Sequence, residues 1–201
     1  MLAKKAKTSV PVNEIIASRW SCRAFDINKP VPREHIVSVC EAGRWAPSCR
    51  GDEPWRYIVW DLYKNRAAYL KAFDCLDEWN QRWVKNVPVI IGVFADSKFR
   101  RGNDNRWGQH DTGAASMNMY LQAVTLGLMA HPMGGFDEVK IKEVFGIPEQ
   151  YTPMAVIAIG YQADAKVIED IGQLESELAE RNRQPLNNCF FDSEWGKGIS
   201  E

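Results

Sequence analysis

Arginines near the start of the chain have the types and spacing needed to bind an anion. Arg19 and Arg23 flank Ser21 at alternate positions in the segment SRWSCRAF. In an extended segment alternate side chains share a face, so two guanidinium groups and a hydroxyl would point the same way. This set matches a phosphate group, because guanidinium forks donate paired hydrogen bonds to phosphate oxygens. A solvated surface carrying two unrelated arginines is the alternative.

A second basic pair lies near the other end of the chain. Arg181 and Arg183 are again two residues apart, in ERNRQPLNN, and Pro185 follows them. If the two chain ends meet, both basic pairs and Ser21 surround one anion. Taken alone, this pair is equally consistent with the charged, frayed end of a helix.

The segment RWAPSCRGDEPW forms a third candidate element. Pro47 ends the preceding helix, and Gly51 permits a tight turn. Ser48 and Cys49 are small, so this loop can present backbone amides toward a flat ligand. A simple connection from helix to strand is the alternative.

Composition excludes several classes of protein. The 201 residues carry a net charge of −1, with 45% hydrophobic and 25% charged residues, which gives no indication of a nucleic-acid or anionic-membrane partner. The chain has five cysteines, an odd number, and no two of them form a C-x-x-C motif. We therefore expect no disulfide scaffold and no metal site. No apolar run is long enough to span a bilayer, and we expect a cytoplasmic protein.

Hydrophobic periodicity and capping residues predict alternating helices and strands. We expect helices at 13–20, 32–45, 112–128 and 137–146, one or two helices within 62–86, and strands at 56–60, 88–95, 129–133 and 154–161, with a polar loop at 100–111. This order predicts an α+β fold, an α/β sandwich with helices packed on a mixed sheet. We expect one domain over 1–201, with a flexible N-terminus at 1–12 and a C-terminal extension at 187–201.

The ordered motifs together resemble the FMN-dependent nitroreductase family. They are SRWSCRAF, PVPREHI, APSCRGDEPW, HDTGAA, HPMGGFD, FGIPEQYTPMAVIAIGY and RNRQPL, and they extend from about residue 14 to residue 187. The resemblance implies a nitroreductase-like fold with a central mixed, mainly antiparallel sheet flanked by helices. It also implies a domain-swapped type of homodimer that binds FMN noncovalently at the subunit interface.

The resemblance assigns the FMN phosphate to residues from both chain ends: Arg19, the Trp20 backbone, Ser21, Arg181 and Arg183. Arg23 matches the basic residue that reaches the ribityl chain and the pyrimidine edge of the flavin. Pro47, Ser48 and Cys49 match a loop that the partner subunit supplies. The chain departs from the commonest family pattern there, with Gly51 in place of asparagine and Glu53 in place of glutamine.

The remaining implied cofactor residues lie near the middle of the chain. Asn80 matches an asparagine that hydrogen-bonds the flavin pyrimidine, although a polar residue on a helix surface fits the sequence as well. Met133, Gly134 and Gly135 match a turn whose backbone amide points at flavin N5, and glycines let the main chain approach the ring. Trp107 and the loop around it are expected to shape the acceptor site.

The implied activity is hydride transfer from NAD(P)H through flavin N5 to nitroaromatic, quinone or related acceptors, by a ping-pong mechanism. No catalytic side chain is required, because the flavin and water can supply protons. The alternatives are another flavin reaction on the same fold, such as reductive dehalogenation, enone reduction or flavin fragmentation, and a non-catalytic FMN-binding protein.

Overall fold

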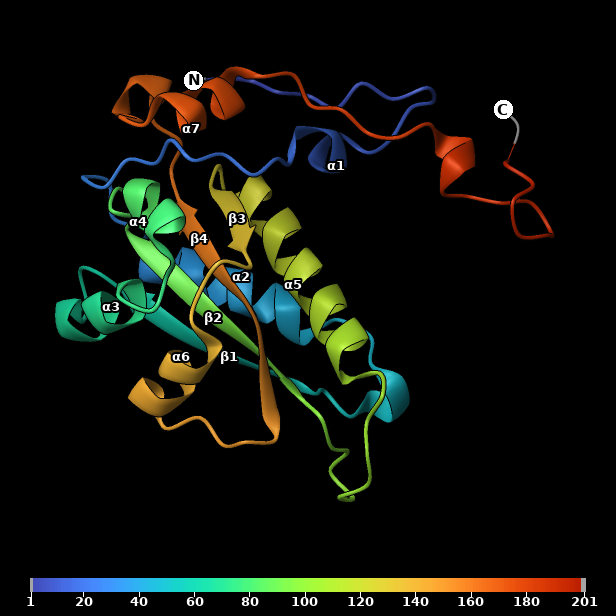
Figure 1. The fold of residues 1–201 in the computed structure, drawn as a ribbon, viewed down its shortest axis with the longest axis horizontal. Helices are drawn as coiled ribbons and strands as arrows, with labels where there is room; N and C mark the ends of the chain where they lie inside the picture. Colours follow the sequence, from blue (N-terminus) through green and yellow to red (C-terminus); the bar gives the residue numbers. More distant parts are fainter. Residues whose placement is uncertain (1, 200–201) are drawn as a thin grey trace.

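The computed structural model describes residues 2–199 and is built on a single four-stranded sheet (Figure 1). The strands are β1 (Trp55–Asp61), β2 (Val89–Asp96), β3 (Met129–Met133) and β4 (Tyr151–Gly160), in the order β1-β2-β4-β3. All three pairings between neighbours are antiparallel. The predicted α+β class is confirmed. The sheet, expected to be mixed but mainly antiparallel, is antiparallel throughout residues 2–199, because β4 lies between β2 and β3 and runs antiparallel to both.

Helices connect the strands and cover both faces of the sheet. They are α1 (Glu14–Ser18), α2 (Arg33–Arg44), α3 (Arg66–Phe73), α4 (Glu78–Val84), α5 (Gly108–Thr125), α6 (Glu138–Phe145) and α7 (Ile171–Leu178). The predicted caps at Asn13 and Asp137 are confirmed, since each side chain accepts a backbone N–H of the first helical turn. Across residues 2–199, no helix combines the length and the apolar character needed to cross a membrane.

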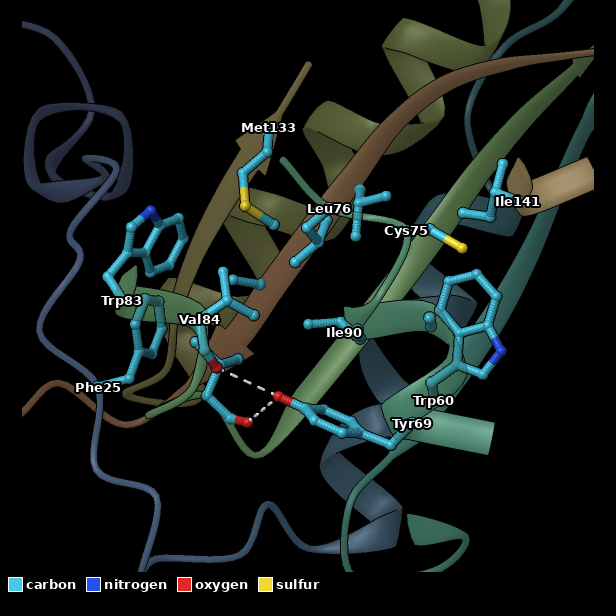
Figure 2. Packing of buried hydrophobic residues seen from close by; sticks show 14 of the residues in the cluster. Phe25, Trp60, Tyr69, Cys75, Leu76, Trp83, Val84, Ile90, Met133 and Ile141 are labelled. Carbon is cyan, nitrogen blue, oxygen red and sulfur yellow. Dashed lines mark hydrogen bonds between the residues drawn. The ribbon is translucent and has the colours of Figure 1, made fainter. Parts of the chain in front are cut away.

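Alternation along β2 divides the core into two clusters. Ile91 faces the side covered by α2 and α5, where Met119 of α5 is fully buried. Ile90 faces the opposite side, which α3, α4 and α6 cover (Figure 2). The whole of β2 apart from its last residue is buried, as expected for a strand covered on both faces. The result is a sandwich of three layers, helix on sheet on helix.

The second cluster also fixes the early extended segment against the core. Trp83 of α4 stacks on Phe25 with ring centroids 5.9 Å apart. Beside them, the Tyr69 hydroxyl lies within hydrogen-bonding distance of the backbone carbonyls of Val84, at 3.2 Å, and Val87, at 2.6 Å (Figure 2). These contacts join α3, the end of α4 and the chain that precedes α2.

Two boundaries differ from the sequence expectations. The helix α5 begins at Gly108, inside the segment expected to be a polar loop. A Cβ on Gly108 would lie 2.2 Å from the Asp96 carbonyl oxygen, so the helix start is pressed against the end of β2. The segment 62–86 contains two helices, α3 and α4, which was one of the two possibilities left open.

The two ends of the chain run side by side along one edge of the molecule before they separate (Figure 1). Gln162 donates a hydrogen bond to the Leu2 carbonyl at 3.0 Å, and Lys4 Nζ donates to the Glu177 carbonyl at 2.8 Å. The start of the segment expected to be flexible is therefore held against the body of the protein. Beyond Arg183 the chain extends away from the sheet.

Candidate functional site

A cationic cleft lies where the two chain ends meet. It has a volume of about 290 Å³, and its lining includes Arg19 and Ser21 from the early segment with Arg181 and Arg183 from the late one. Lys4 also lines it. The structure thus brings Arg19 and Ser21 of the early segment together with the late basic pair, whereas Arg23, the other arginine of the early pair, does not line this cleft.

The early segment presents its polar residues in the way that an extended chain predicts. Trp20 and Cys22 are buried, and so is Ala24. The intervening residues Arg19 and Ser21 are half-buried and point into the cleft, where Arg19 Nη1 lies 3.4 Å from Ser21 Oγ. Alternate burial therefore places these donors on one face.

The cleft carries an excess of positive charge: four cationic residues line it, and its one lining carboxylate, Glu180, pairs with Lys7. Burial lowers the pKa of Arg19, and the nearby charges of Arg181 and Arg183 lower it further. Within residues 2–199, neither Arg19 nor Arg183 has a carboxylate partner at ion-pair distance. Cations held together without counterions, in a partly desolvated cleft, form a site for an anion.

Arg181 has a structural role as well. Its Nη1 donates hydrogen bonds to the carbonyls of Lys4, at 2.7 Å, and Ala17, at 2.9 Å. One side of this guanidinium ties the chain ends together, and its other N–H groups remain for a ligand.

Lys4 was not identified from the sequence. Its Nζ lies 4.7 Å from the Trp20 ring centroid, a cation–π contact, and burial lowers the pKa of Lys4. The neighbouring lysines pair with exposed carboxylates instead, Lys5 with Glu14 and Lys7 with Glu180. The sequence MLAKKAK does not distinguish Lys4 from Lys5 and Lys7, because only the folded chain places Lys4 at the cleft.

Glu177 of α7 is a second residue that sequence reasoning missed. Its buried carboxylate accepts the backbone N–H of Arg23 at 2.8 Å and of Ala24 at 3.4 Å. Arg23 itself does not line the cleft, and its buried Nε has no hydrogen-bond partner within the described chain. Arg23 therefore keeps a desolvated donor beside the cleft, which is costly unless a ligand satisfies it.

The turn after β3 is built around Gly135. Its carbonyl accepts hydrogen bonds from Asn80 Nδ2 and from the Asp77 backbone, each at 3.1 Å. A Cβ on Gly135 would lie 2.0 Å from Asp77 Oδ2, so the turn requires glycine. A Cβ on Gly134 would meet nothing within 4 Å, which leaves this backbone open to an approaching ligand.

Asn80 is buried, so it is not a polar residue on an open helix surface. Its Oδ1 accepts from Trp83 Nε1 at 3.2 Å, and its Nδ2 holds the Gly135 carbonyl. One N–H of the amide remains for a ligand. The Met133 side chain lies in the core (Figure 2), so only its backbone can face a cofactor, as the expected role of this turn requires.

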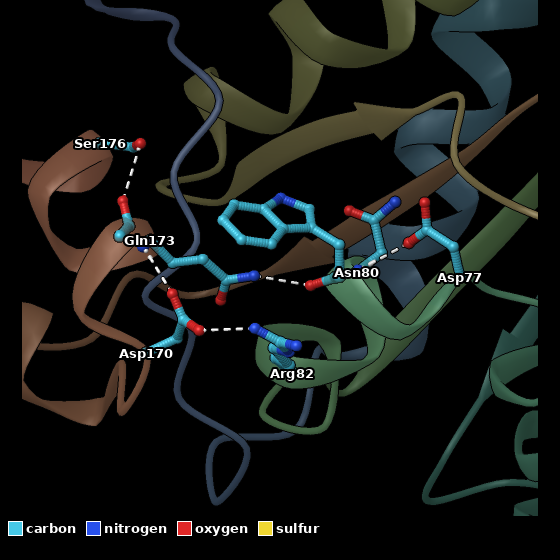
Figure 3. A network of polar contacts seen from close by, with 8 residues as sticks. Asp77, Asn80, Arg82, Asp170, Gln173 and Ser176 are labelled. Carbon is cyan, nitrogen blue, oxygen red and sulfur yellow. Dashed lines mark hydrogen bonds and ion pairs between the residues drawn. The ribbon is translucent and has the colours of Figure 1, made fainter.

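A polar network holds α4, which carries Asn80, to α7, which carries Glu177 (Figure 3). Arg82 pairs with Asp170 at 2.8 Å, and Asp170 caps α7 through the Gln173 backbone N–H at 3.0 Å. The Gln173 side chain donates to the Trp79 carbonyl at 2.6 Å. The two helices therefore position the glycine turn and the early segment together.

The loop that contains Pro47, Ser48, Cys49 and Gly51 lies far from the cleft within one chain. The Cys49 N–H donates to Asp111 at 2.8 Å, at the start of α5. Val124, near the other end of α5, lines a pocket together with Trp20. A helical rise of 1.5 Å per residue puts about 20 Å between these two ends. A single chain does not bring this loop to the arginines.

Comparison with known proteins places the chain among its relatives. A model described as "Nitroreductase family" matches residues 16–161, well over half of the chain. The chain belongs to the nitroreductase family.

Individual relatives extend across most of this nitroreductase-family chain. A protein of Methanothermobacter thermautotrophicus named "Putative NADH dehydrogenase/NAD(P)H nitroreductase" is 33% identical over 168 residues, which is 82% of this chain and 84% of that protein. A crystal structure described as an oxidoreductase containing FMN is 30% identical, with a TM-score of 0.88 over 97% of this chain and 98% of that one. A nitroreductase family protein from Clostridium difficile 630 is 23% identical, with a TM-score of 0.69 over 90% and 96%, and shows the same fold.

Proposed function

We propose that this chain is an FMN-dependent oxidoreductase that takes hydride from NAD(P)H and delivers it to nitroaromatic, quinone or related acceptors by a ping-pong mechanism. The observation that carries the proposal is the cleft with an excess of cationic residues that both chain ends form. Family membership and the related structure described as containing FMN support it.

The residues present fit a flavin that bears a phosphate. Arg19, Ser21, Arg181 and Arg183 supply donors from one cleft, and Lys4 adds a further charge. Charge-assisted hydrogen bonds contribute roughly 1.5–3 kcal/mol each, so a few of them retain FMN without a covalent bond.

The same set accommodates the ring system. The segment that carries Arg23 lies against β3, where His131 Nδ1 donates to the Cys22 carbonyl at 2.8 Å. From His131 the strand leads to Gly134, about 10 Å further at the usual rise per residue of a strand. This distance between the contact with the Arg23 segment and the open Gly134 backbone matches the size of a flat heterocycle. The orphaned Arg23 Nε is the donor that this heterocycle would satisfy.

Bound FMN would supply the redox chemistry, accepting hydride at N5 and passing it to the second substrate. The protein binds and orients it. The guanidinium groups in the cleft hold the phosphate, and the Arg23 charge opposes negative charge at the pyrimidine edge. The free N–H of Asn80 is a donor to the same edge, and the Gly134 backbone leaves the N5 side unobstructed. No side chain of the set is needed as a proton donor.

We propose a homodimer whose sites combine both subunits. The loop of Pro47, Ser48, Cys49 and Gly51 would reach the cleft of the other copy, since about 20 Å of α5 separates the two within one chain. The C-terminal extension supports an intersubunit contact, because Trp195 is 93% exposed on an arm that leaves the body of the protein (Figure 1).

Subunit complementation tests the shared site. Arg19→Ala and a Pro47–Cys49 loop replacement are each expected to abolish turnover as homodimers. Co-expression restores part of it, because a mixed dimer contains one site with neither defect. Absence of any recovery, with mixed dimers shown by mass spectrometry, would contradict the shared site.

The chemistry is tested by anaerobic stopped-flow absorbance of the purified protein. The proposal expects a yellow protein that NADH or NADPH bleaches and that nitroaromatics or quinones recolour. Bleaching followed by slow turnover of those acceptors would indicate a different flavin reaction. A yellow protein that neither nucleotide bleaches would indicate a non-catalytic FMN carrier. Arg33→Ala, on the exposed start of α2, is the matched control for Arg19→Ala.

A further inference from the structure

Two neighbouring aromatic rings, each with an arginine guanidinium over it, lie close to Cys49 in the fold. The Arg50 guanidinium lies 5.3 Å from the Phe99 ring centroid, and the Phe99 and Trp107 centroids are 6.3 Å apart. The Arg106 guanidinium lies 5.3 Å from the Trp107 ring. We call these four residues the arginine–aromatic ladder.

The ladder carries positive charge without counterions. Nearby, Lys98 pairs with Asp104, and Arg100 pairs with Glu53 at 3.5 Å. In the described part of the chain, Arg50 and Arg106 have no carboxylate at ion-pair distance. Trp107 keeps 42% of its surface exposed. Within the described residues, the open indole of Trp107 has the unpaired Arg106 guanidinium beside it, and the unpaired Arg50 guanidinium lies over the neighbouring Phe99 ring. Such an arrangement can stack a flat ring and bind an anionic group attached to it.

The backbone that presents the ladder is strained and firmly held. Arg50 and Glu53 are not glycines, yet they have φ values of 59° and 51°. Hydrogen bonds fix this turn, from the Glu53 N–H to Ser48 Oγ at 3.0 Å and from the Arg100 N–H to the Asp52 carboxylate at 3.1 Å. Strained conformations of this kind persist where the surrounding structure over-determines them, and they concentrate at ligand sites.

We propose that the arginine–aromatic ladder binds the 2′-phosphoadenosine end of NADPH and makes the enzyme prefer NADPH to NADH. This inference rests on the proposed function. Arg50 directly follows Cys49, which belongs to the loop proposed to reach the flavin of the partner subunit, so the ladder borders that composite site. Adenine stacks on the exposed indole of Trp107, and the 2′-phosphate, absent from NADH, pairs with the Arg106 guanidinium beside that ring, with the Arg50 charge beyond Phe99 adding to the attraction.

Equilibrium binding of two nucleotide fragments tests the ladder without turnover. The FMN-loaded protein is titrated calorimetrically with 2′,5′-ADP and with 5′-AMP. We expect 2′,5′-ADP to bind at least about 10-fold more tightly, as one charge-assisted contact predicts. Arg50→Ala and Arg106→Ala should each reduce that ratio, and Arg106→Lys should preserve part of it. Trp107→Ala should weaken both nucleotides to a similar degree.

The matched control is Arg33→Ala, which should leave the ratio unchanged. Equal binding of the two fragments to the wild-type protein would overturn the inference. So would an unchanged ratio in both arginine variants, or variants that alter only the oligomeric mass in gel filtration. Failure of the proposed function has a different signature, in which neither NADH nor NADPH bleaches the flavin whatever the fragments do.

Discussion

The carboxylate of Glu177 accepts the backbone N–H of Arg23 at 2.8 Å, which joins α7 to the segment that carries Arg19 and Ser21. The same carboxylate accepts the Ala24 N–H at 3.4 Å. Because Glu177 holds main-chain atoms of this segment, it fixes how the segment presents the residues proposed to bind phosphate. We regard it as a positioning residue.

Replacing Glu177 by glutamine should destabilise the protein and weaken FMN binding together. The amide would turn an N–H toward one of two backbone donors and leave it unpaired, which costs about 1–3 kcal/mol. Urea denaturation followed by circular dichroism measures the first effect, and fluorescence titration of apoprotein with FMN measures the second. Glu175→Gln is the control, because Glu175 lies on the exposed side of α7. A normal FMN affinity in the Glu177 variant would remove the positioning role.

Titration of Glu177 should make the free energy of unfolding depend on pH. Burial raises the pKa of Glu177 above its usual 4.5 and outweighs the lowering by its hydrogen bonds. A carboxyl with a raised folded pKa binds its proton more readily in the folded state. Its stabilisation is therefore fully present below pH 4.5 and is lost as the pH rises through the folded pKa. The difference in unfolding free energy between wild type and Glu177→Gln should shrink over that interval and then become constant. A difference that grows with rising pH would contradict the raised pKa.

His131 should affect stability in the opposite direction. Burial, together with the charges of Arg23 and Arg19, lowers the pKa of His131 from 6.5 to about 4. The unfolded chain then binds more protons between these values, so stability falls as the pH drops through this range, by about 3 kcal/mol in total. His131→Asn keeps a donor for the Cys22 carbonyl and removes the titration, so its stability profile should be flatter. An imidazole NMR titration of the wild type near pH 6.5 would contradict this prediction.

The residues that sequence reasoning found and missed differ in how they act. The sequence indicated Arg19, Ser21, Arg181 and Arg183 because hydrogen-bond donors at alternate positions predict an anion-binding site without knowledge of the fold. Their meeting in one cleft was a conditional expectation that depended on both chain ends converging, and the structure shows that they converge.

Glu177 was missed because a glutamate in a short amphipathic helix carries no local sign of its partners. Its role appears only where α7 meets a segment about 150 residues earlier in the chain. The mixed sheet was expected because helices separate the strands, a pattern that parallel and antiparallel connections share. The direction of each strand depends on where β4 inserts, which local periodicity does not encode.

Lys4 should contribute to phosphate affinity although it lies in the segment expected to be flexible. Its Nζ lies over Trp20 at the edge of the cleft. Lys4→Met should raise the Kd for FMN by about 10-fold, in proportion to one charge-assisted contact, and the loss should shrink at high salt. Lys5→Met removes an equal charge that pairs with exposed Glu14, neither of which lines the cleft, and it should change the Kd little. Equal effects of the two variants would show that only net charge matters.

Substitution of the two glycines in the turn after β3 should distinguish an effect on stability from an effect on flavin reduction. Gly135→Ala places a Cβ 2.0 Å from Asp77 Oδ2 and 2.6 Å from Asn80 Nδ2, so it should cost several kcal/mol of stability, about 2–4 by analogy with overpacked sites. The Cβ of Gly134→Ala would lie in open space. The variant should therefore unfold with the urea midpoint of the wild type or a slightly higher one. Because its new methyl lies on the side proposed for the flavin ring, Gly134→Ala should still slow bleaching of bound FMN by NADPH. Wild-type bleaching in a fully folded Gly134→Ala protein would place the flavin away from this turn.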